Sequence, residues 1–322
     1  MRQVAVGFLE AIQTAPLVLT EGAVIERLRR DSTLALNPHV LHAGFIYEER
    51  GREALRRLYR QYLDIGAAFD LPMMVCTPTW RANPVRLQHA HLAHRDVNGD
   101  GVRFVTSIRD EYGAYAKRVF VGGLVGCAGD AYKPEEGLSV DRAAAFHGAQ
   151  TWALAEAGAD FLLAATLPNV AEARGLAVAM EECSVPYILS FVLGRNGRLL
   201  DGTSLHDAVS GIDAAVTPRP LFYMVNCVHP TVFEAALASA PAQVRHVNDR
   251  IIGLQANASA KSPEELEGLS YVDADPPEML AAGMARVYRR FGTKILGGCC
   301  GTDHRHIEWI ARRAAECARP NV

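Results

Sequence analysis

Short runs of consecutive apolar residues alternate along the chain with longer segments in which apolar residues recur every three or four positions. Such runs are typical of strands covered on both faces, and such segments are typical of helices with one buried face. Strands are expected at residues 15–20, 71–77, 118–126, 160–166, 186–192, 221–227, 250–256 and 294–300. Helices are expected at residues 52–68, 140–159, 170–183, 204–216, 277–292 and 304–318. A short amphipathic helix is expected before the first strand.

Eight strand–helix units in one chain, with no linker-like break in composition, predict the (β/α)8 or TIM barrel of the α/β class. We expect residues 1–322 to form a single barrel domain. The alternative is a doubly wound open sheet, but the first strand is not followed by the GxGxxG motif that often accompanies that fold.

The composition narrows the possible partners. The chain has 322 residues, of which 49% are hydrophobic and 21% charged, and its formal net charge is −3. This balance provides no basic surface for nucleic acid, and no segment approaches the roughly 20 apolar residues of a membrane span. Seven cysteines without a signal peptide indicate a reducing compartment, so we expect a cytoplasmic protein whose clustered thiols are ligands or catalysts.

Three of these cysteines fall at the ends of predicted strands. Cys227 ends the sixth strand, and Cys299 and Cys300 end the eighth. Because the active site of such a barrel lies at the carboxyl ends of its strands, the three thiols are expected to meet. Three thiolates with an open fourth position describe a catalytic zinc site. The alternative is that all three are small buried residues.

Adjacent residues of a regular strand point to opposite sides, so Cys299 and Cys300 reach one ion only where the backbone departs from regular extension. We expect the flanking glycines to permit that departure. These glycines are Gly297, Gly298 and Gly301. The other strand ends supply candidate substrate-binding residues, namely Glu21, Gly22, Thr77, Trp80, Arg81 and Asn226.

The motifs "VNC" at 225–227 and "GGCCGT" at 297–302 resemble the zinc signature of the homocysteine S-methyltransferase family. "LTEGAVIERL" (19–28), "FHGAQTWALAEAGADFLL" (146–163) and "LLDGTSL" (199–205) are similar to further stretches of that family. The resemblance covers nearly the whole chain, and the cysteine motifs are its most specific part.

The resemblance implies a zinc-dependent barrel that transfers a methyl group to a thiol in methionine biosynthesis. Cys227, Cys299 and Cys300 would hold Zn2+, and the sulfur of the acceptor would take the fourth position. The chain length leaves no room for folate and cobalamin domains, so a small onium donor such as S-methylmethionine is implied. Trp80 and Tyr132 are candidates to offer ring faces to this cation. The oligomeric state is left open.

The sequence departs from the family pattern in its pocket. Ala165 stands where the family usually has a glutamate that helps to hold the amino group of homocysteine, and Arg81 follows Trp80 after the second strand. These changes shift the pocket toward positive charge. The acceptor is therefore homocysteine or another thiol or selenol that carries a carboxylate for Arg81 and no ammonium group.

Two other classes of function are alternatives. A zinc hydrolase would normally show histidine and aspartate ligands at several strand ends, and three thiolates make zinc a poor Lewis acid. A catalytically silent zinc-binding relative is the second alternative, because of Ala165.

His304 and His306 are expected to be surface residues in the first turn of the last helix, capped by Thr302 or Asp303.

Overall fold

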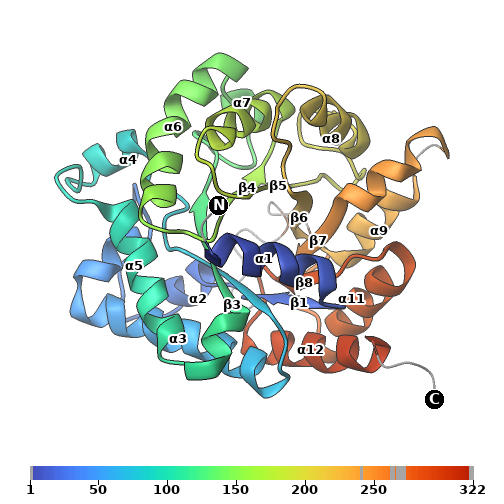
Figure 1. Ribbon diagram of the computed structural model, residues 1–322, viewed down its shortest axis with the longest axis horizontal. Helices are drawn as coiled ribbons and strands as arrows, with labels where there is room; N and C mark the ends of the chain where they lie inside the picture. The colour runs from blue at the N-terminus through green and yellow to red at the C-terminus, as the bar shows by residue number, and fades with distance from the viewer. Residues whose placement is uncertain (1–2, 240–241, 262–264, 266–272, 319–322) are drawn as a thin grey trace.

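Eight parallel strands close into a barrel in the computed structural model, which describes residues 3–239, 242–261, 265 and 273–318 (Figure 1). The strands are β1 (Val18–Thr20), β2 (Met73–Cys76), β3 (Val119–Val125), β4 (Phe161–Leu167), β5 (Tyr187–Phe191), β6 (Phe222–Val228), β7 (Ile251–Ala256) and β8 (Ile295–Gly298). Each strand pairs with its sequence neighbour, and β1 pairs with β8 through Val18 and Ile295. The TIM-barrel prediction is confirmed, and the open sheet is excluded because no strand is left at an edge.

Helices surround the barrel. They are α1 (Gln3–Thr14), α2 (Ile25–Arg29), α3 (Glu49–Ala68), α4 (Pro84–His89), α5 (Val97–Asp110), α6 (Val140–Glu156), α7 (Val170–Glu181), α8 (Leu205–Asp213), α9 (Pro230–Ala238), α11 (Pro277–Phe291) and α12 (His304–Ala318). Short 3-10 helices lie at Ala43–Tyr47, Gly113–Arg118, Pro134–Glu136 and Ala242–Arg250. All six predicted long helices are present, as is the expected amphipathic helix before the first strand. The sequence pattern did not predict the short helices α2 and α4, nor α5 and α9.

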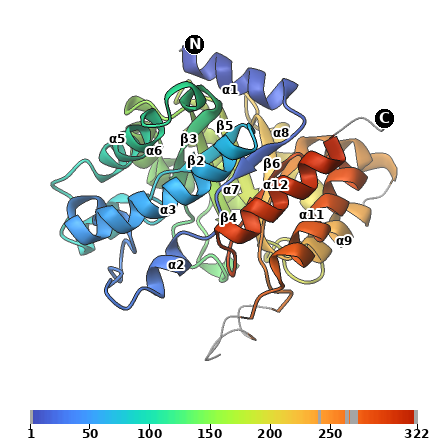
Figure 2. The same ribbon diagram turned by 90° about the horizontal axis from the view of Figure 1, so that it is seen from below.

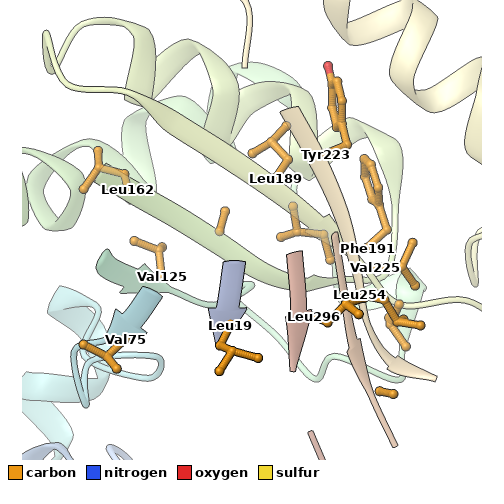
Figure 3. Close-up of a cluster of buried hydrophobic side chains, with 14 of the residues drawn as sticks. Leu19, Val75, Val125, Leu162, Leu189, Phe191, Tyr223, Val225, Leu254 and Leu296 are labelled. Atoms are coloured by element: carbon orange, nitrogen blue, oxygen red, sulfur yellow. The ribbon is translucent and has the colours of Figure 1, made fainter. Parts of the chain in front are cut away.

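The alternation of side chains along each strand builds two hydrophobic layers. Leu19, Val75 and Leu296 belong to a large cluster between the barrel and its helices, and Figure 3 shows side chains of this cluster. Their neighbours in sequence, including Val18 and Met74, belong to a second cluster in the barrel interior. Both faces of the strands are therefore buried, which explains why the strands are apolar at consecutive positions.

Helix α1 covers the amino-terminal end of the barrel and crosses in front of the strands in Figure 1. Its Phe8 is fully buried and stacks on Phe161 with ring centroids 4.6 Å apart and ring planes 13° apart. A second ring, Phe120, lies 5.2 Å from Phe8. Figure 2 shows α1 at one end of the molecule and α2, which follows β1, toward the other. The carboxyl ends of the strands thus lie away from α1. In the part of the chain that the structure describes, no helix is long and apolar enough to span a bilayer.

Candidate metal centre

The structure brings three cysteines together at the carboxyl ends of β6 and β8. The sulfur atoms of Cys227, Cys299 and Cys300 all lie within 4.8 Å of one another, and each side chain is partly exposed. The Cα atoms of Cys227 and Cys299 are 5.4 Å apart, and their sulfurs are in disulfide contact. Among the described residues no other group of three or more histidine, cysteine or acidic side chains has this geometry.

Two local departures from regular backbone aim the sulfurs at one point. Cys227 has a φ of 56°, in the left-handed region, where the β6–β7 register shifts between Asn226 and Val228. This bulge turns the Cys227 side chain out of the strand alternation. Cys299 and Cys300 follow the last residue of β8 and lead into a turn at Gly301, which has a φ of 78°. The left-handed conformation at Gly301 is one that glycine adopts at little cost.

Gly297 and Gly298 have a different role from the one expected. Both are buried residues of the regular strand β8, so they do not bend the backbone. A Cβ atom added to Gly297 would lie 1.9 Å from the hydroxyl oxygen of Thr20, and one added to Gly298 would lie 2.3 Å from that of Thr302. These glycines therefore allow neighbouring segments to approach closely, and only Gly301 provides the expected backbone freedom.

A buried asparagine that the sequence reading missed ties the two halves of the cluster together. The Asn257 side chain accepts a hydrogen bond from the Cys300 backbone N–H at 3.1 Å and donates one to the Cys227 carbonyl at 3.0 Å. Asn257 directly follows β7, which lies between β6 and β8. Its position at the carboxyl end of a strand could have marked Asn257 as a site residue. Its two contacts could not be predicted, because both are to backbone atoms far away in sequence.

Replacing Asn257 by alanine is expected to weaken the binding of a metal ion such as zinc to the three cysteines about 10- to 100-fold, as is typical when a group that orients metal ligands is lost. The global fold should persist, because the barrel hydrogen bonds are untouched. Competition with a chelating dye in reducing buffer measures the affinity. Asn248→Ala is the matched control, since the Asn248 side chain likewise accepts one hydrogen bond, from the His206 ring, and donates one, to the Leu237 carbonyl, but away from the cysteines. Equal affinities in the two variants would contradict the assigned role of Asn257.

Asn226 links the cysteine cluster to the nearby strands β4 and β5. Its side-chain oxygen accepts hydrogen bonds from the Thr166 backbone N–H at 2.9 Å and the Ser190 hydroxyl at 2.7 Å. Its amide nitrogen donates to the Thr166 hydroxyl at 2.7 Å and to the sulfur of Cys227 at 3.3 Å. Thr166 itself has a φ of 60° at an irregular point of β4. All the strong hydrogen-bonding capacity of Asn226 is used, so it orients Cys227 and β4 within a rigid network.

Glu21 is a buried carboxyl group at the end of β1. Its Oε1 atom accepts a hydrogen bond from the Cys76 backbone N–H at 3.1 Å, whereas its Oε2 atom is buried without a partner. Burial raises the pKa of Glu21 from its usual value near 4.5 to about 7. The next residue, Gly22, lies against Tyr62 and Thr302, whose hydroxyl oxygens would be 2.9 Å and 3.0 Å from an added Cβ atom. The segment is therefore held tightly with one acceptor atom unused.

Of the residues after β2, Thr77 is buried, whereas Trp80 and Arg81 are partly exposed. Thr77 is 1% exposed, accepts a hydrogen bond from the Leu124 backbone N–H at 2.9 Å and shares one with Thr79 at 2.6 Å. Its hydroxyl is thus committed to joining β2 to β3. The Trp80 indole N–H donates to the Ala165 carbonyl at 3.2 Å, and the Arg81 guanidinium stacks 4.4 Å from the centre of the Trp80 ring. That ring face is therefore taken by Arg81 and is closed to an onium donor.

The histidines that follow the cysteine pair are placed differently from each other. Asp303 caps α12, as expected, by accepting a hydrogen bond from the Arg305 backbone N–H at 3.0 Å. His304 is partly exposed. The expectation of a surface residue is wrong for His306, which is 4% exposed. Its ring lies 2.9 Å from an Asp303 carboxylate oxygen and 3.2 Å from the Asp275 carbonyl. His306 therefore fastens the chain before α11 to the start of α12.

The donor set fits zinc. Three sulfur ligands with a free fourth position match a catalytic zinc site, and soft thiolates favour zinc over magnesium or calcium. Burial raises the pKa of the Cys300 thiol to about 11, so a bound cation is needed to hold it as a thiolate near neutral pH. Zinc binds thiolates and not disulfide sulfurs, so metal loading requires the reduced protein.

A TIM barrel with three thiols gathered at the carboxyl ends of its strands has a donor set that could hold a metal ion at the usual place of the active site. The sequence profile described as "Homocysteine S-methyltransferase" matches residues 18–314. The chain belongs to this family of thiol S-methyltransferases.

Individual relatives agree with this assignment at low identity. The chain is 26% identical over 277 residues to a homocysteine S-methyltransferase of Escherichia coli, covering 81% of this chain and 84% of the relative. It is 24% identical over 321 residues to the homocysteine S-methyltransferase YbgG of Bacillus subtilis, covering 93% and 95% of the two chains.

The fold is shared with crystal structures of the homocysteine methyltransferase MmuM from Escherichia coli. The oxidised form has a TM-score of 0.76 at 23% identity, and the metallated form has a TM-score of 0.74 at 21% identity. Each comparison covers 95% of this chain and 99% of the other.

Proposed function

We propose that the protein transfers a methyl group from a small onium donor, such as S-methylmethionine, to a thiolate bound at a zinc site formed by Cys227, Cys299 and Cys300. The convergence of these three sulfurs within 4.8 Å is the observation that carries the proposal. Family membership supports methyl transfer to a thiol. A metallated form is known for MmuM, which shares this fold.

When bound, zinc supplies charge that keeps the acceptor sulfur deprotonated and nucleophilic. The residues of this chain do the positioning. Asn257 fixes the backbones of Cys227 and Cys300, and Asn226 holds the Cys227 sulfur toward β4. This rigid frame fixes the direction in which the acceptor sulfur faces the donor methyl group, and correct orientation is a large part of the rate gain for a two-substrate reaction.

Homocysteine or a related thiol is the proposed acceptor. Glu21 lies at the same barrel rim with Oε2 unpartnered, which suits a charged amino group of the acceptor. Ala165 is 6% exposed and brings no second carboxylate, so Glu21 would act alone. A carboxylated thiol or selenol without an ammonium group is the alternative acceptor.

Replacing Glu21 by glutamine is expected to raise the KM for homocysteine about tenfold or more at pH 8, because a charged hydrogen bond to the amino group is lost. The variant should nevertheless be more stable than the parent at pH 8. Burial raises the pKa of Glu21 to about 7, so the folded state binds more protons than the unfolded state between about pH 4.5 and 7. The contribution of Glu21 to the free energy of unfolding is therefore fully present below about pH 4.5 and is lost as the pH rises to about 7 and above.

Steady-state kinetics and urea unfolding at pH 5.5 and pH 8 together test the assignment of Glu21. A matched reaction with 3-mercaptopropionate, which has no amino group, serves as the control and should be little changed by Glu21→Gln. A KM for homocysteine that does not rise in the variant would show that Glu21 does not bind the amine.

The reaction itself is tested with the reduced, zinc-loaded protein, S-methylmethionine and homocysteine, with methionine formation followed by mass spectrometry. Methyl transfer that stops when zinc is chelated and returns when zinc is restored supports the proposal. Full zinc occupancy without methyl transfer to homocysteine, 3-mercaptopropionate or a selenol would instead identify a catalytically silent zinc-binding relative.

The proposed setting is a reducing, cytoplasmic one. The proposed site functions only with reduced thiols, and Cys76, Cys127 and Cys183 are buried free cysteines. The proposed partners are the small thiol acceptor and the methyl donor.

A further inference from the structure

Two arginines from the segment that follows β2 converge on the loop after β3. The Arg81 guanidinium donates to the Gly129 carbonyl at 2.5 Å. The Arg86 guanidinium reaches the adjacent Ala128 carbonyl at 3.4 Å and the His39 carbonyl at 3.3 Å. Because the two cations bind neighbouring carbonyl groups, their charges lie close together at the carboxyl end of the barrel.

Neither arginine forms an ion pair with any residue that the structure describes. The two carboxylates on the adjoining loop are engaged with the loop itself. Asp130 accepts a hydrogen bond from the Tyr132 backbone N–H at 2.9 Å. Glu136 accepts one from the Asp130 backbone N–H at 2.8 Å, and its other oxygen lies 3.5 Å from Lys133. Neither carboxylate is paired with Arg81 or Arg86, although the charges of both act on Arg86.

The Arg86 side chain also leaves a donor unused. Its Nε atom is buried and has no hydrogen-bond partner. A buried unsatisfied donor is costly, and an arginine uses Nε together with a terminal nitrogen when it binds a carboxylate through two parallel hydrogen bonds. Burial, and then the charge of Arg81, lowers the pKa of Arg86, and the charges of Asp130 and Glu136 offset only part of this effect.

These arginines adjoin the proposed reaction site through a short series of contacts. Arg81 stacks on Trp80, and the Trp80 indole N–H donates to the carbonyl of Ala165 on β4. The next residue, Thr166, shares two hydrogen bonds with Asn226, which in turn contacts the Cys227 sulfur. The contacts run from β2 to β6 along one rim of the barrel.

We propose that Arg81 and Arg86 form a carboxylate-binding site at the mouth of the barrel, which holds the carboxylate of one of the two small substrates. Arg86 has an unpartnered Nε donor, and neither guanidinium group forms an ion pair with a residue that the structure describes. A carboxylate would supply both the acceptor and the paired charge. The carboxylate could belong to the thiol acceptor or to the onium donor, and this part of the proposal rests on the proposed function. The binding of a carboxylate by the two arginines does not rest on it.

Binding is tested without turnover in the reduced, metal-free protein. We expect 3-mercaptopropionate to shift the Nε–H nuclear magnetic resonance signal of Arg86, identified by its loss in Arg86→Lys. The uncharged analogue 3-mercaptopropionamide should leave it in place. Arg81→Gln should weaken the binding about tenfold or more, as expected for a charge-assisted hydrogen bond. Arg95→Gln is the matched control, because Arg95 stacks on Tyr47 in the same way, at 4.5 Å, but is exposed.

Kinetic comparisons then identify the source of the carboxylate. One arm compares the acceptors 3-mercaptopropionate and 3-mercaptopropionamide, and the other compares the donors S-methylmethionine and trimethylsulfonium. The arm that shows the following effect identifies the substrate whose carboxylate is bound. In that arm, Arg81→Gln and Arg86→Gln should raise the KM of the carboxylated compound about tenfold or more and change the KM of the uncharged compound less than about twofold. Arg81→Lys, which keeps the charge but loses the planar guanidinium group, should have an intermediate effect.

Two results would overturn the proposal. The first is an Arg86 Nε–H signal that responds equally to the acid and the amide, or to neither. The second is an equal loss for carboxylated and uncharged compounds in both kinetic arms, which would show that the arginines only support the loop. If the signal responds as expected but no methyl transfer occurs with any pair, the carboxylate site stands and the proposed function fails.

Discussion

Replacing Cys227 by serine is expected to lower methyl transfer by a factor on the order of 10³ or more, equivalent to about 4 kcal/mol of transition-state stabilisation. The variant keeps a similar side-chain volume but loses one of three thiolates at the only described cluster of this kind. The zinc content of the purified, reduced variant should fall in parallel. Activity is measured as methionine formed from homocysteine, and zinc by mass spectrometry of the protein.

Cys183→Ser provides the matched control for that change. Cys183 is a buried free cysteine whose sulfur contacts the Ala179 carbonyl at 3.4 Å, near the end of α7 and outside the cysteine cluster. The control should retain the parent's zinc content and nearly all of its activity. A Cys227→Ser enzyme with full zinc and undiminished turnover would remove Cys227 from the site.

Replacing Phe8 by alanine is expected to lower the free energy of unfolding by about 3–5 kcal/mol, the usual cost of removing a buried aromatic ring. Phe8 is fully buried against Phe120 and Phe161, where α1 closes the barrel end opposite the cysteines. Urea unfolding at 25 °C measures the loss. Zinc content per folded molecule should be unchanged, because the cysteine cluster lies at the other end of the strands.

Phe146→Ala is the comparison for the Phe8 variant. Phe146 is only half-buried on α6, so its removal should cost clearly less. An equal decrease in the free energy of unfolding for the two variants would contradict the conclusion that α1 closes the amino-terminal end of the barrel.

The strands could be predicted because they are buried on both faces. Runs such as residues 160–166 and 186–192 are apolar at consecutive positions, and β4 and β5 lie there within a residue or so. Helices α5 and α9 escaped prediction for local reasons. The first turns of α5 contain Gly99 and Gly101, and α9 begins with Pro230. Glycine and proline usually interrupt a helical pattern, although proline is tolerated in the first turn.

The meeting of the cysteines was predictable because parallel strands present their carboxyl ends at one rim, whatever their separation in sequence. The contacts that support the cysteine cluster could not be predicted from the sequence. Asn257 binds backbone atoms of residues 30 and 43 positions away, and these contacts leave no trace in local pattern. The roles of Gly297 and Gly298 depend on Thr20 and Thr302, which only the folded chain brings near. The close approach of two segments and the choice of hydrogen-bond partners both depend on the tertiary structure.

X-ray absorption spectroscopy at the zinc edge tests the central claim most directly, with the reduced, zinc-loaded protein before and after addition of homocysteine. Three sulfur neighbours at about 2.3 Å in the free protein, rising to four with the thiol, are the predicted result. The same spectrum for Cys300→Ser should begin with two. A zinc ion that shows fewer than three sulfurs in the unaltered protein, or that gains no sulfur when homocysteine is added, would contradict thiol activation at this site.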